Sequence, residues 1–545
     1  MNHNIRQLIK ETGAHNTPDG LADYVAERLL YWLSPSLLQQ GGVVLDPACG
    51  DGQLLLALAK RMNVITRQLF RFIGSDANQD AVASARKRLI EVGVNEPVSH
   101  TLDFLALPKD LVSSTALASD VGVLSNPIPL ADIIIANPPY VRTQVMGSDK
   151  SKQLAKQFGL NGRVDLYHAF LIAMTHQLKD GGLLAVITSN KFLFAKGTTS
   201  LRQFLADNYE IQEVIDLGDT KLFSAAVLPA VLIAKKVSPS YQRNGLPSFT
   251  TIYERHGTDN SIPADAVEAE SVYEILRKQS IGTFVASDRV FSVSKGSILL
   301  PDDAEEPWPM VTADEREWID RINARSKGRF GDITDVRVGV KTTADNVFIR
   351  TDWDTLPPDH RPEDVLLRPL LSNDDTQKWS TLKQSRRRIL YTHEVRDGKR
   401  TPINLNDYPR ARTYLESHYE QLHGRKYVID AKRKWYEIWV PQNPDAWQHP
   451  KIVFPDISQT PKFCLDTSGH IVDGNCYWIT AWPSLGLEML YLLLALANSS
   501  LMRRYHDLSF ANRLYAGRRR FLTQYVSKYP IPDIETSVSR EIIRI

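Results

Sequence analysis

The tetrapeptide Asn137-Pro138-Pro139-Tyr140 carries the most specific chemical signal in the sequence. Two consecutive prolines hold the backbone rigidly. The side-chain oxygen of Asn137 and the carbonyl oxygen of Pro138 can then both accept hydrogen bonds from one amino group. The ring of Tyr140 offers a face on which a planar group can stack. These residues therefore predict a site that holds an amide or exocyclic amino group, and a merely rigid loop is the alternative.

A second motif, Asp-Pro-Ala-Cys-Gly-Asp-Gly at residues 46–52, lies between a short apolar run and a helical pattern. Its glycines allow a ligand to approach the backbone closely. Its two aspartates would repel a pyrophosphate but attract a cofactor that carries a sulfonium and an ammonium group. The motif predicts a nucleoside-cofactor site, with a structural turn as the alternative. The residues expected to contact the cofactor are Asp46, Ala48, Cys49, Gly50 and Gly52.

Acidic residues also lie at the ends of the next two expected strands, the second of which is a third strand that ends at Asp103-Phe104. Asp76 ends an apolar run, and a carboxylate at that place can accept hydrogen bonds from both hydroxyls of a ribose. Asp103 could accept a hydrogen bond from an adenine amino group while the ring of Phe104 packs on the base. Each residue alone could be an ordinary loop residue. Their order along successive strands favours one common site.

Strands and helices alternate along the first 240 residues, which predicts a Rossmann-like α/β fold whose mostly parallel sheet has helices on both faces. The last two strands have only about ten residues between them, too few for a helical crossover, so an antiparallel pair is expected at the edge. The expected strands are 43–46, 71–76, 131–140 (with a turn), 183–190, 211–218 and 229–236, and the expected helices are 20–33, 53–62, 81–93, 166–179 and 201–208.

The composition changes to a linker type at residues 237–247, and the periodicity is weaker beyond them. We therefore expect an α/β domain over residues 1–240 and a second, less regular α+β domain over residues 245–545. Residues 381–545 carry 25 Lys and Arg against 16 Asp and Glu. Such an excess is typical of a surface that faces a polyanion, although an ordinary solvated surface can also carry it.

The composition excludes several classes of protein. With 545 residues, 43% hydrophobic and 23% charged, the chain is neither disordered, collagen-like nor a coiled coil. Its three cysteines cannot form a disulfide framework and have no zinc-site spacing, so no metal is expected. The apolar run 485–497 is shorter than the ~20 residues of a membrane span and predicts a buried helix. A cytoplasmic protein without membrane contact is expected.

The order of these motifs resembles the gamma class of N6-adenine DNA methyltransferases of type II restriction–modification systems, the TaqI-like, Eco57I-type family. The resemblance is strong over residues 15–236 and looser over residues 330–535. It implies methyl transfer from S-adenosylmethionine (SAM) to the N6 amino group of an adenine flipped out of double-stranded DNA. It implies a SAM domain followed by a DNA target-recognition domain. A separate restriction endonuclease is a possible partner, and a monomer is expected.

The resemblance also assigns roles to particular residues. Thr17 would hold the methionine end of SAM, Asp76 the ribose, and Asp103 with Phe104 the adenine. Many members carry Glu where this chain has Asp76. The shorter aspartate side chain has a shorter reach to the ribose. The catalytic residues implied by the resemblance are Asn137, Pro138, Pro139 and Tyr140, together with Phe223, which would pack against the flipped base.

Other segments match the family in position. Residues 162–167 match the helix start after the catalytic loop, and residues 217–223 match the segment that presents Phe223. Residues 339–349 and 515–532 are similar to recurring pieces of the recognition domain. Three basic stretches are candidate phosphate contacts, with a solvated surface as the alternative. They are residues 383–388, 432–436 and 518–520.

Several other functions are compatible with parts of this pattern. Asn-Pro-Pro-Tyr also suits a protein glutamine or an RNA base, but such enzymes rarely need a C-terminal domain of this size. Cytosine-N4 methylation more often uses Ser in place of Asn137. A restriction enzyme that also cleaves is expected to need a nuclease domain before Thr17. A modification subunit that uses a separate specificity protein is expected to need a long helical domain before the SAM loop. A non-catalytic DNA-binding module would not need the intact tetrapeptide.

Overall fold

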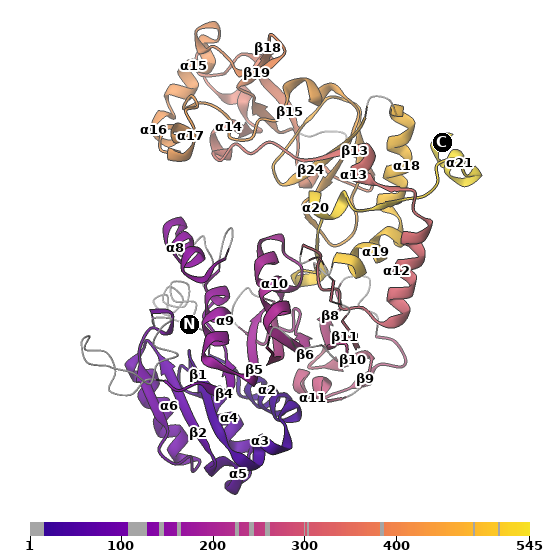
Figure 1. Cartoon of the computed structure of the whole chain (residues 1–545). Coiled ribbons are helices and arrows are strands. Elements are labelled where there is room, and N and C mark those ends of the chain that lie inside the picture. Colours follow the sequence, from indigo (N-terminus) through magenta and orange to yellow (C-terminus); the bar gives the residue numbers. More distant parts are fainter. Residues whose placement is uncertain are drawn as a thin grey trace. The chain divides into compact units, whose positions relative to one another are not determined.

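The computed structural model describes residues 16–106, 128–140, 147–160, 165–223, 228–238, 245–256, 262–278, 280–298, 300, 301, 303, 305–381, 386–482, 485–510 and 513–544. These residues form two compact units (Figure 1). Unit 1 is the described chain up to Arg316 together with Leu514–Gly517, and unit 2 is the described remainder. The units thus divide later in the sequence than the change of composition at residues 237–247.

In the part of the chain that is described, unit 1 is built on an 11-stranded sheet of order β3-β2-β1-β4-β5-β7-β6-β8-β11-β10-β9. Strands β3, β2, β1, β4 and β5 run parallel, which confirms the expected α/β class. The strands are β1 Gly42–Asp46, β2 Phe70–Asp76, β3 Val98–Thr101, β4 Ala131–Ala136, β5 Leu178–Ser189, β6 Tyr209–Asp216, β7 Pro229–Lys236, β8 Ser248–Glu254, β9 Val267–Glu268, β10 Gly282–Ala286 and β11 Arg289–Ser297.

The antiparallel pairing of β6 with β7 is confirmed, and β7 also pairs antiparallel with β5. The sheet does not end at this pair, because β6 has a second neighbour, the parallel strand β8. Strands β11, β10 and β9 then extend the sheet further. This extension is the reason that unit 1 continues to Arg316.

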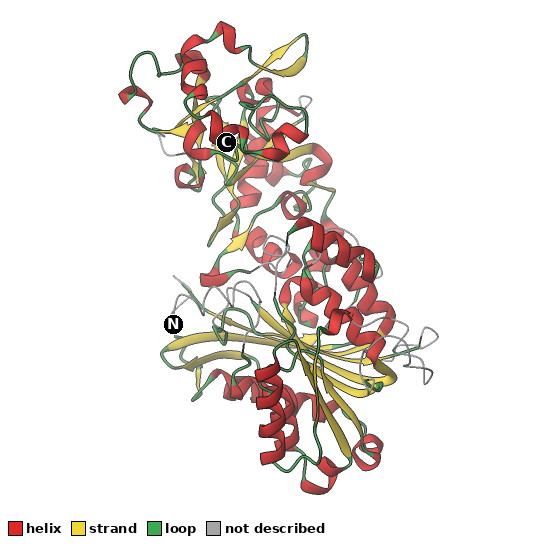
Figure 2. Ribbon diagram, turned by 90° about the vertical axis from the view of Figure 1, so that its left-hand side faces the viewer, coloured by secondary structure: helices red, strands yellow, loops and turns green. Residues whose placement is uncertain are grey.

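Helices cover both faces of the sheet in unit 1 (Figure 2). Alternate residues of the strands point to opposite faces, so neighbours such as Ile133 and Ile134 enter different hydrophobic clusters. Helices α2, α4 and α6 pack on the first face, and α8, α9 and α10 pack on the second. The helices are α2 Asp19–Trp32, α3 Pro35–Gln40, α4 Gln53–Arg61, α5 Val64–Gln68, α6 Gln79–Glu91, α8 Ser148–Phe158, α9 Leu166–Gln177, α10 Thr199–Asn208 and α11 Val272–Arg277.

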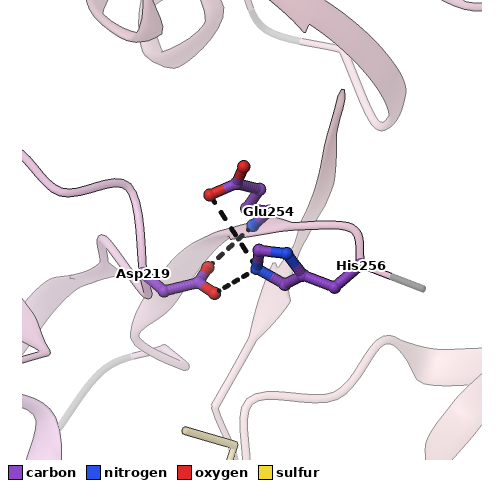
Figure 3. Close-up of side chains that lie close together, drawn as sticks. All are labelled: Asp219, Glu254 and His256. Atoms are coloured by element: carbon purple, nitrogen blue, oxygen red, sulfur yellow. Dashed lines mark hydrogen bonds and ion pairs between the residues drawn. The ribbon is translucent and has the colours of Figure 1, made fainter. Parts of the chain in front are cut away.

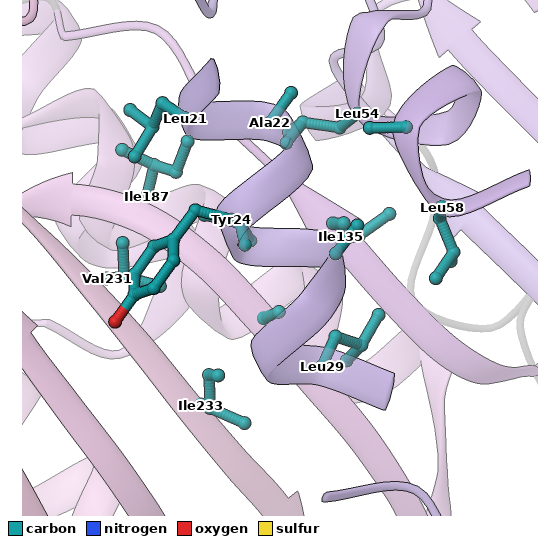
Figure 4. Packing of buried hydrophobic residues seen from close by; sticks show 14 of the residues in the cluster. Leu21, Ala22, Tyr24, Leu29, Leu54, Leu58, Ile135, Ile187, Val231 and Ile233 are labelled. Atoms are coloured by element: carbon teal, nitrogen blue, oxygen red, sulfur yellow. The ribbon is translucent and has the colours of Figure 1, made fainter. Parts of the chain in front are cut away.

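Helix α2 is held on the sheet by its apolar face. Leu21, Tyr24 and Leu29 are buried in one cluster with the central strands, and Leu21 lies beside Ile187 and Tyr24 beside Val231 (Figure 4). Each fully buried side chain of this kind contributes roughly 1.5–3 kcal/mol. This packing fixes the start of α2 and with it the preceding residues, which contribute to the candidate site described below.

Gly52 is required by the packing of α4 against α6. Its φ is +81°, and a Cβ there would lie 2.8 Å from the Cβ of Ala85. We expect Gly52→Ala to lower the free energy of unfolding by about 1–3 kcal/mol, measured by denaturant titration, because left-handed strain and a steric clash add. Gly50→Ala is the matched control, since Gly50 has φ +52° but nothing within 4 Å. Equal losses in the two variants would contradict the packing argument.

Unit 2 contains short strands in several small sheets and a core of buried aromatic residues that includes Trp353, Trp447 and Trp478. The apolar run 485–497 forms the largely buried helix α18, as expected. The elements are α12 Ala313–Arg325, which begins in unit 1, β12 Gly328–Arg329, α13 Phe330–Ile333, β13 Thr334–Val338, α14 Asp345–Phe348, β14 Ile349–Arg350, β15 Leu367–Leu371, β16 Trp379–Ser380, β17 Arg388–Leu390, β18 His393–Arg396, β19 Lys399–Pro402, α15 Pro409–Glu416, α16 Tyr419–His423, α17 Lys426–Asp430, β20 Lys451–Pro455, β21 Ile457–Ser458, β22 Cys464–Asp466, β23 Ile471–Val472, β24 Cys476–Ala481, α18 Gly486–Asn498, α19 Ser500–Phe510, β25 Arg519–Arg520, α20 Thr523–Val526, β26 Pro530–Ile531 and α21 Ser537–Arg544.

Of the helices in the described ranges, none combines the length and the apolar character needed to cross a lipid bilayer.

Candidate functional site

A pocket of about 910 Å³ lies at the carboxyl ends of β1, β2, β3 and β4 in unit 1. Ligands of α/β sheets bind at this edge. Of the residues expected to contact a cofactor, all but Gly52 line the pocket. They are Thr17, Asp46, Ala48, Cys49, Gly50, Asp76, Asp103, Phe104 and Asn137.

The loop after β1 is tied to the end of β2. The backbone N–H of Cys49 donates to the carbonyl of Ser75 at 2.9 Å, and the N–H of Gly50 donates to Oδ2 of Asp76 at 2.9 Å. Oδ1 of Asp76 accepts a second hydrogen bond from the N–H of Asn78. Each carboxylate oxygen has two lone pairs, so Asp76 can shape the loop and still accept hydrogen bonds from a ligand.

The pocket is acidic. Four carboxylates line it, and no Lys or Arg is among its described lining residues. The carboxyl of Asp46 is 1% exposed, and burial raises its pKa to about 8; the nearby charge of Asp76 acts in the same direction and the hydrogen bond from Ala48 in the opposite one. Burial also raises the pKa of the Cys49 thiol, which keeps it neutral. Such a lining is electrostatically suited to a cationic ligand.

An aromatic pair forms one wall of the pocket. The rings of Phe104 and Phe170 are stacked at 6.1 Å between centroids. Asp103, just before Phe104, accepts a hydrogen bond from the N–H of Leu105 at 3.1 Å. Asp103 has the second oxygen of its carboxylate for a ligand donor, and Phe104 is among the residues that line the pocket.

One side of the pocket is formed by residues that the sequence motifs do not predict. Gln153 and Gln157 of α8 and Leu166 and Phe170 of α9 also line it. Both pairs are spaced by four residues, which places each pair on one face of its helix. That spacing was the available signal, but spacing does not show which face of a helix meets the sheet edge.

Asn137 follows β4 directly, and its amide is oriented by two hydrogen bonds. Nδ2 donates to Oγ1 of Thr17 at 3.0 Å, and Oδ1 accepts from the hydroxyl of Tyr140 at 2.8 Å. The amide nitrogen thus faces Thr17, and the amide oxygen faces Tyr140. Pro139 lines the pocket beside Asn137, whereas Pro138 is buried and Tyr140 is half-buried without lining it.

The remaining expected residues are more scattered. Phe223 is half-buried in unit 1, packs against the cluster of α2, and does not line the pocket. Gly162 to Val164 and Lys383 to Ser385 lie outside the described residues. In the last basic stretch, the Nε atom of Arg519 lies 2.5 Å from Oδ1 of Asp507 and its side chain is 12% exposed. Arg519 therefore forms an ion pair within unit 2.

Comparison with known proteins identifies the family. The model of the Eco57I restriction-modification methylase matches residues 131–223, and that of the TaqI-like C-terminal specificity domain matches residues 399–531. The type II methyltransferase M.BanIII of Aneurinibacillus aneurinilyticus is 47% identical over 540 residues, which cover 98% of this chain and 92% of that protein. The type II methyltransferase M.BstVI of Geobacillus stearothermophilus is 24% identical and covers 90% of this chain and 85% of its own length.

Among solved structures, the type IIL restriction-modification enzyme MmeI in complex with DNA has the same fold. Its TM-score is 0.54 at 14% identity, and the match covers 96% of this chain and 67% of that one. The near-full-length similarity to M.BanIII and the two family matches confirm the resemblance noted in the sequence. The chain therefore belongs to the type II restriction–modification methyltransferases, with an Eco57I-type methylase region and a TaqI-like C-terminal specificity domain.

Proposed function

We propose that the protein is a site-specific DNA methyltransferase that transfers a methyl group from SAM to the N6 amino group of an adenine flipped out of double-stranded DNA. It is the modification enzyme of a type II restriction–modification system. The main support is the placement of Asn137, whose amide is hydrogen-bonded to Thr17 and Tyr140 beside an acidic pocket. Unit 1 is the catalytic unit and unit 2 the DNA target-recognition unit.

The residues of the pocket fit SAM. Its sulfonium and ammonium groups are complementary to the carboxylates, whereas a phosphate-bearing cofactor would be repelled by them. Asp76 would hold the ribose hydroxyls, Asp103 and Phe104 the adenine ring, and Thr17 the methionine end. When bound, SAM supplies the methyl group for transfer.

The chain's own residues prepare the target amine. The adenine amino nitrogen is a weak nucleophile because its lone pair is delocalised into the ring, and it is out of reach until the base is extruded at a cost of a few kcal/mol. Oδ1 of Asn137 and the carbonyl of Pro138 accept the two amino hydrogens, which draws the nitrogen toward tetrahedral geometry and localises its lone pair. The Asn137 oxygen can accept from Tyr140 and from the amine together, since it has two lone pairs.

The two aromatic residues hold the extruded base. Tyr140 stacks on it, and Phe223 packs against it. No strong general base is required, because the amino proton becomes acidic once the nitrogen is alkylated. Most of the acceleration then comes from positioning and electrostatic complementarity.

The raised pKa of Asp46 predicts pH-dependent cofactor binding. The pKa of the Asp46 carboxyl rises from its usual value of 3.8 to about 8. The protonated carboxyl therefore stabilises the cofactor-free fold fully below about pH 4, and this stabilisation is lost as the pH rises through 8. A bound cation favours the carboxylate. We therefore expect SAM affinity, measured by calorimetry, to rise by up to about tenfold per pH unit between pH 6 and 8 and then to level off.

Asp46→Asn is the control for this prediction, because an amide of the same size does not titrate. Titration of the SAM amine itself would affect the SAM affinity of the wild type and of Asp46→Asn equally, so it cancels when their pH profiles are compared. Identical pH profiles for the wild type and Asp46→Asn would contradict the assignment.

Double-stranded DNA is the proposed partner of unit 2, with a separate restriction endonuclease acting on the same site. The excess of nine positive charges over residues 381–545 supports a polyanion-binding surface. Lys432 and Lys434 are both exposed, and the Nζ atom of Lys434 lies 5.7 Å from the centre of the Tyr436 ring. Such aromatic-flanked lysines suit phosphate contacts.

The deciding test is single-molecule sequencing of genomic DNA from a methylation-deficient bacterial host that expresses the chain. Methyladenine at one short motif is the expected result, and it also gives the recognition sequence. If the protein is well expressed and binds SAM but leaves genomic DNA unmodified, the proposal is overturned. RNA and protein glutamine would then be the substrates to test.

A further inference from the structure

The segment Leu217–Phe223, called here the β6 loop, joins the end of β6 to the aromatic residue Phe223. Its backbone is left-handed at Gly218 (φ +49°) and at Lys221 (φ +59°). A Cβ on Gly218 would lie 2.3 Å from the carbonyl oxygen of Ile252, so the loop lies directly against β8. A left-handed lysine is strained, and such a conformation persists only where the surroundings fix it.

Two side chains fix the middle of the loop. Asp219 is 1% exposed, and its two oxygens accept hydrogen bonds from the N–H of Glu254 at 2.8 Å and from Nε2 of His256 at 2.9 Å (Figure 3). Arg289 donates from Nη1 to the carbonyl of Thr220 at 3.0 Å and from Nη2 to the carbonyl of Asp219 at 3.3 Å. The loop is thus held through the side chain of Asp219 and through the backbone carbonyls of Asp219 and Thr220.

The first half of the loop has an anchor of its own. Oδ1 of the buried Asp216 accepts the N–H of Gly218 at 3.0 Å, and Oδ2 accepts the hydroxyl of Tyr253 at 2.5 Å. Asn190 donates to both oxygens of Asp216. Tyr253 and Glu254 lie on β8 and Arg289 on β11, whereas Asn190 and His256 lie just beyond the ends of β5 and β8.

The same cluster is not proposed as a metal site. Ligand atoms of Asp219, Glu254 and His256 lie within 4.8 Å of one another. However, Oε2 of Glu254 is already 2.7 Å from Nη2 of Arg289 and 3.6 Å from Nζ of Lys221. Burial raises the pKa of Glu254, but the hydrogen bond and charge of Arg289 outweigh burial and hold it below its usual range. A further cation would be repelled by these two.

We propose that His256 and Arg289 are positioning residues, which hold the β6 loop through Asp219 and Thr220 so that Phe223 meets the extruded base. Neither residue is among those that line the described pocket, so they act through the loop and not on the cofactor. This inference rests on the proposed function, because only that function gives Phe223 a base to contact.

The test uses the full chain and a DNA duplex with one target site, in single-turnover methylation with SAM. His256→Ala and Arg289→Met are each expected to lower the transfer rate by about tenfold, since small misplacements of a positioning group have effects of this order or larger. SAM affinity should stay within twofold. His256→Gln, which keeps an N–H donor for Asp219, should recover most of the rate. His176→Ala, an exposed histidine of the same unit, is the matched control.

A double-mutant cycle separates positioning from general destabilisation. In the Phe223→Ala background, His256→Ala should have little further effect, because the group that the loop positions is already absent. The inference would be overturned if the double variant lost transfer rate by the product of the two single-variant losses. A transfer rate for His256→Ala within twofold of the wild type would also overturn it.

Hydrogen exchange distinguishes failure of this inference from failure of the proposed function. Peptides covering residues 217–223 should exchange faster in both variants than in the wild type, whatever the substrate is. If the wild type methylates no adenine, the proposed function fails and the role of Phe223 fails with it. Unchanged exchange in both variants overturns the anchoring of the loop even if methylation is observed.

Discussion

Replacing Asn137 by alanine is expected to lower the methyl-transfer rate by at least about 10³-fold, measured in single-turnover reactions on a duplex with one site. The substitution removes the acceptor that localises the lone pair of the amine. It also removes the bond from the Asn137 amide to Thr17 and leaves the Tyr140 hydroxyl without this acceptor. Because the interaction strengthens only as the nitrogen becomes tetrahedral, the rate falls while binding persists.

The affinities for SAM and DNA should therefore change by less than about tenfold in this variant. Asn63→Ala is the matched control, because Asn63 is an exposed asparagine that caps α5 in the same unit. Its transfer rate should equal that of the wild type. A rate for Asn137→Ala close to the wild-type rate would remove Asn137 from the proposed mechanism.

Replacing Asp76 by alanine should weaken SAM binding about 100-fold in calorimetry. A hydrogen bond from a hydroxyl to a charged carboxylate contributes about 1.5–3 kcal/mol to the binding free energy, and two ribose hydroxyls are available. The same carboxylate accepts the N–H groups of Gly50 and Asn78, so its loss also releases the loop of residues 46–52. Asp76→Asn should have a smaller effect of about tenfold, since one oxygen remains as an acceptor.

Asp80→Ala provides the comparison for Asp76. Asp80 carries the same charge four residues later, is exposed in the first turn of α6, and does not line the pocket. Removing it should leave SAM affinity within about twofold, because an exposed charge at this distance is screened. Equal weakening in the two alanine variants would mean that Asp76 acts only through the overall charge of this edge.

The first half of unit 1 could be predicted because its signals are local. The apolar runs that become β1, β2 and β4 alternate with helical patterns, and this alternation implies parallel strands and crossovers. The end of the sheet could not be predicted in the same way. Residues 237–247 have a loop composition, but a loop does not end a sheet, and β8 pairs with β6 across it.

The candidate site likewise contains residues that the sequence predicts and residues that only the fold brings to the pocket. Asp46, Asp76 and Asn137 each follow an apolar strand, so their arrival at one edge follows from the chain order of a parallel sheet. Gln153 and Phe170 reach the pocket through the packing of α8 and α9, which the sequence spacing leaves open. Arg519 belongs to a stretch that the sequence predicts as a phosphate contact, and the fold places it beside Asp507.

By itself the sequence determined the fold class, the family and the order of the residues that approach the pocket, because these depend on periodicity and on motifs at strand ends. Only the tertiary structure decided where the sheet stops, which side chains hold the Asn137 amide, and what holds the β6 loop. These features depend on contacts between residues far apart in the chain, such as Thr17 with Asn137 and His256 with Asp219. No local pattern encodes such pairs, because each partner is an ordinary polar residue until the fold brings the two together.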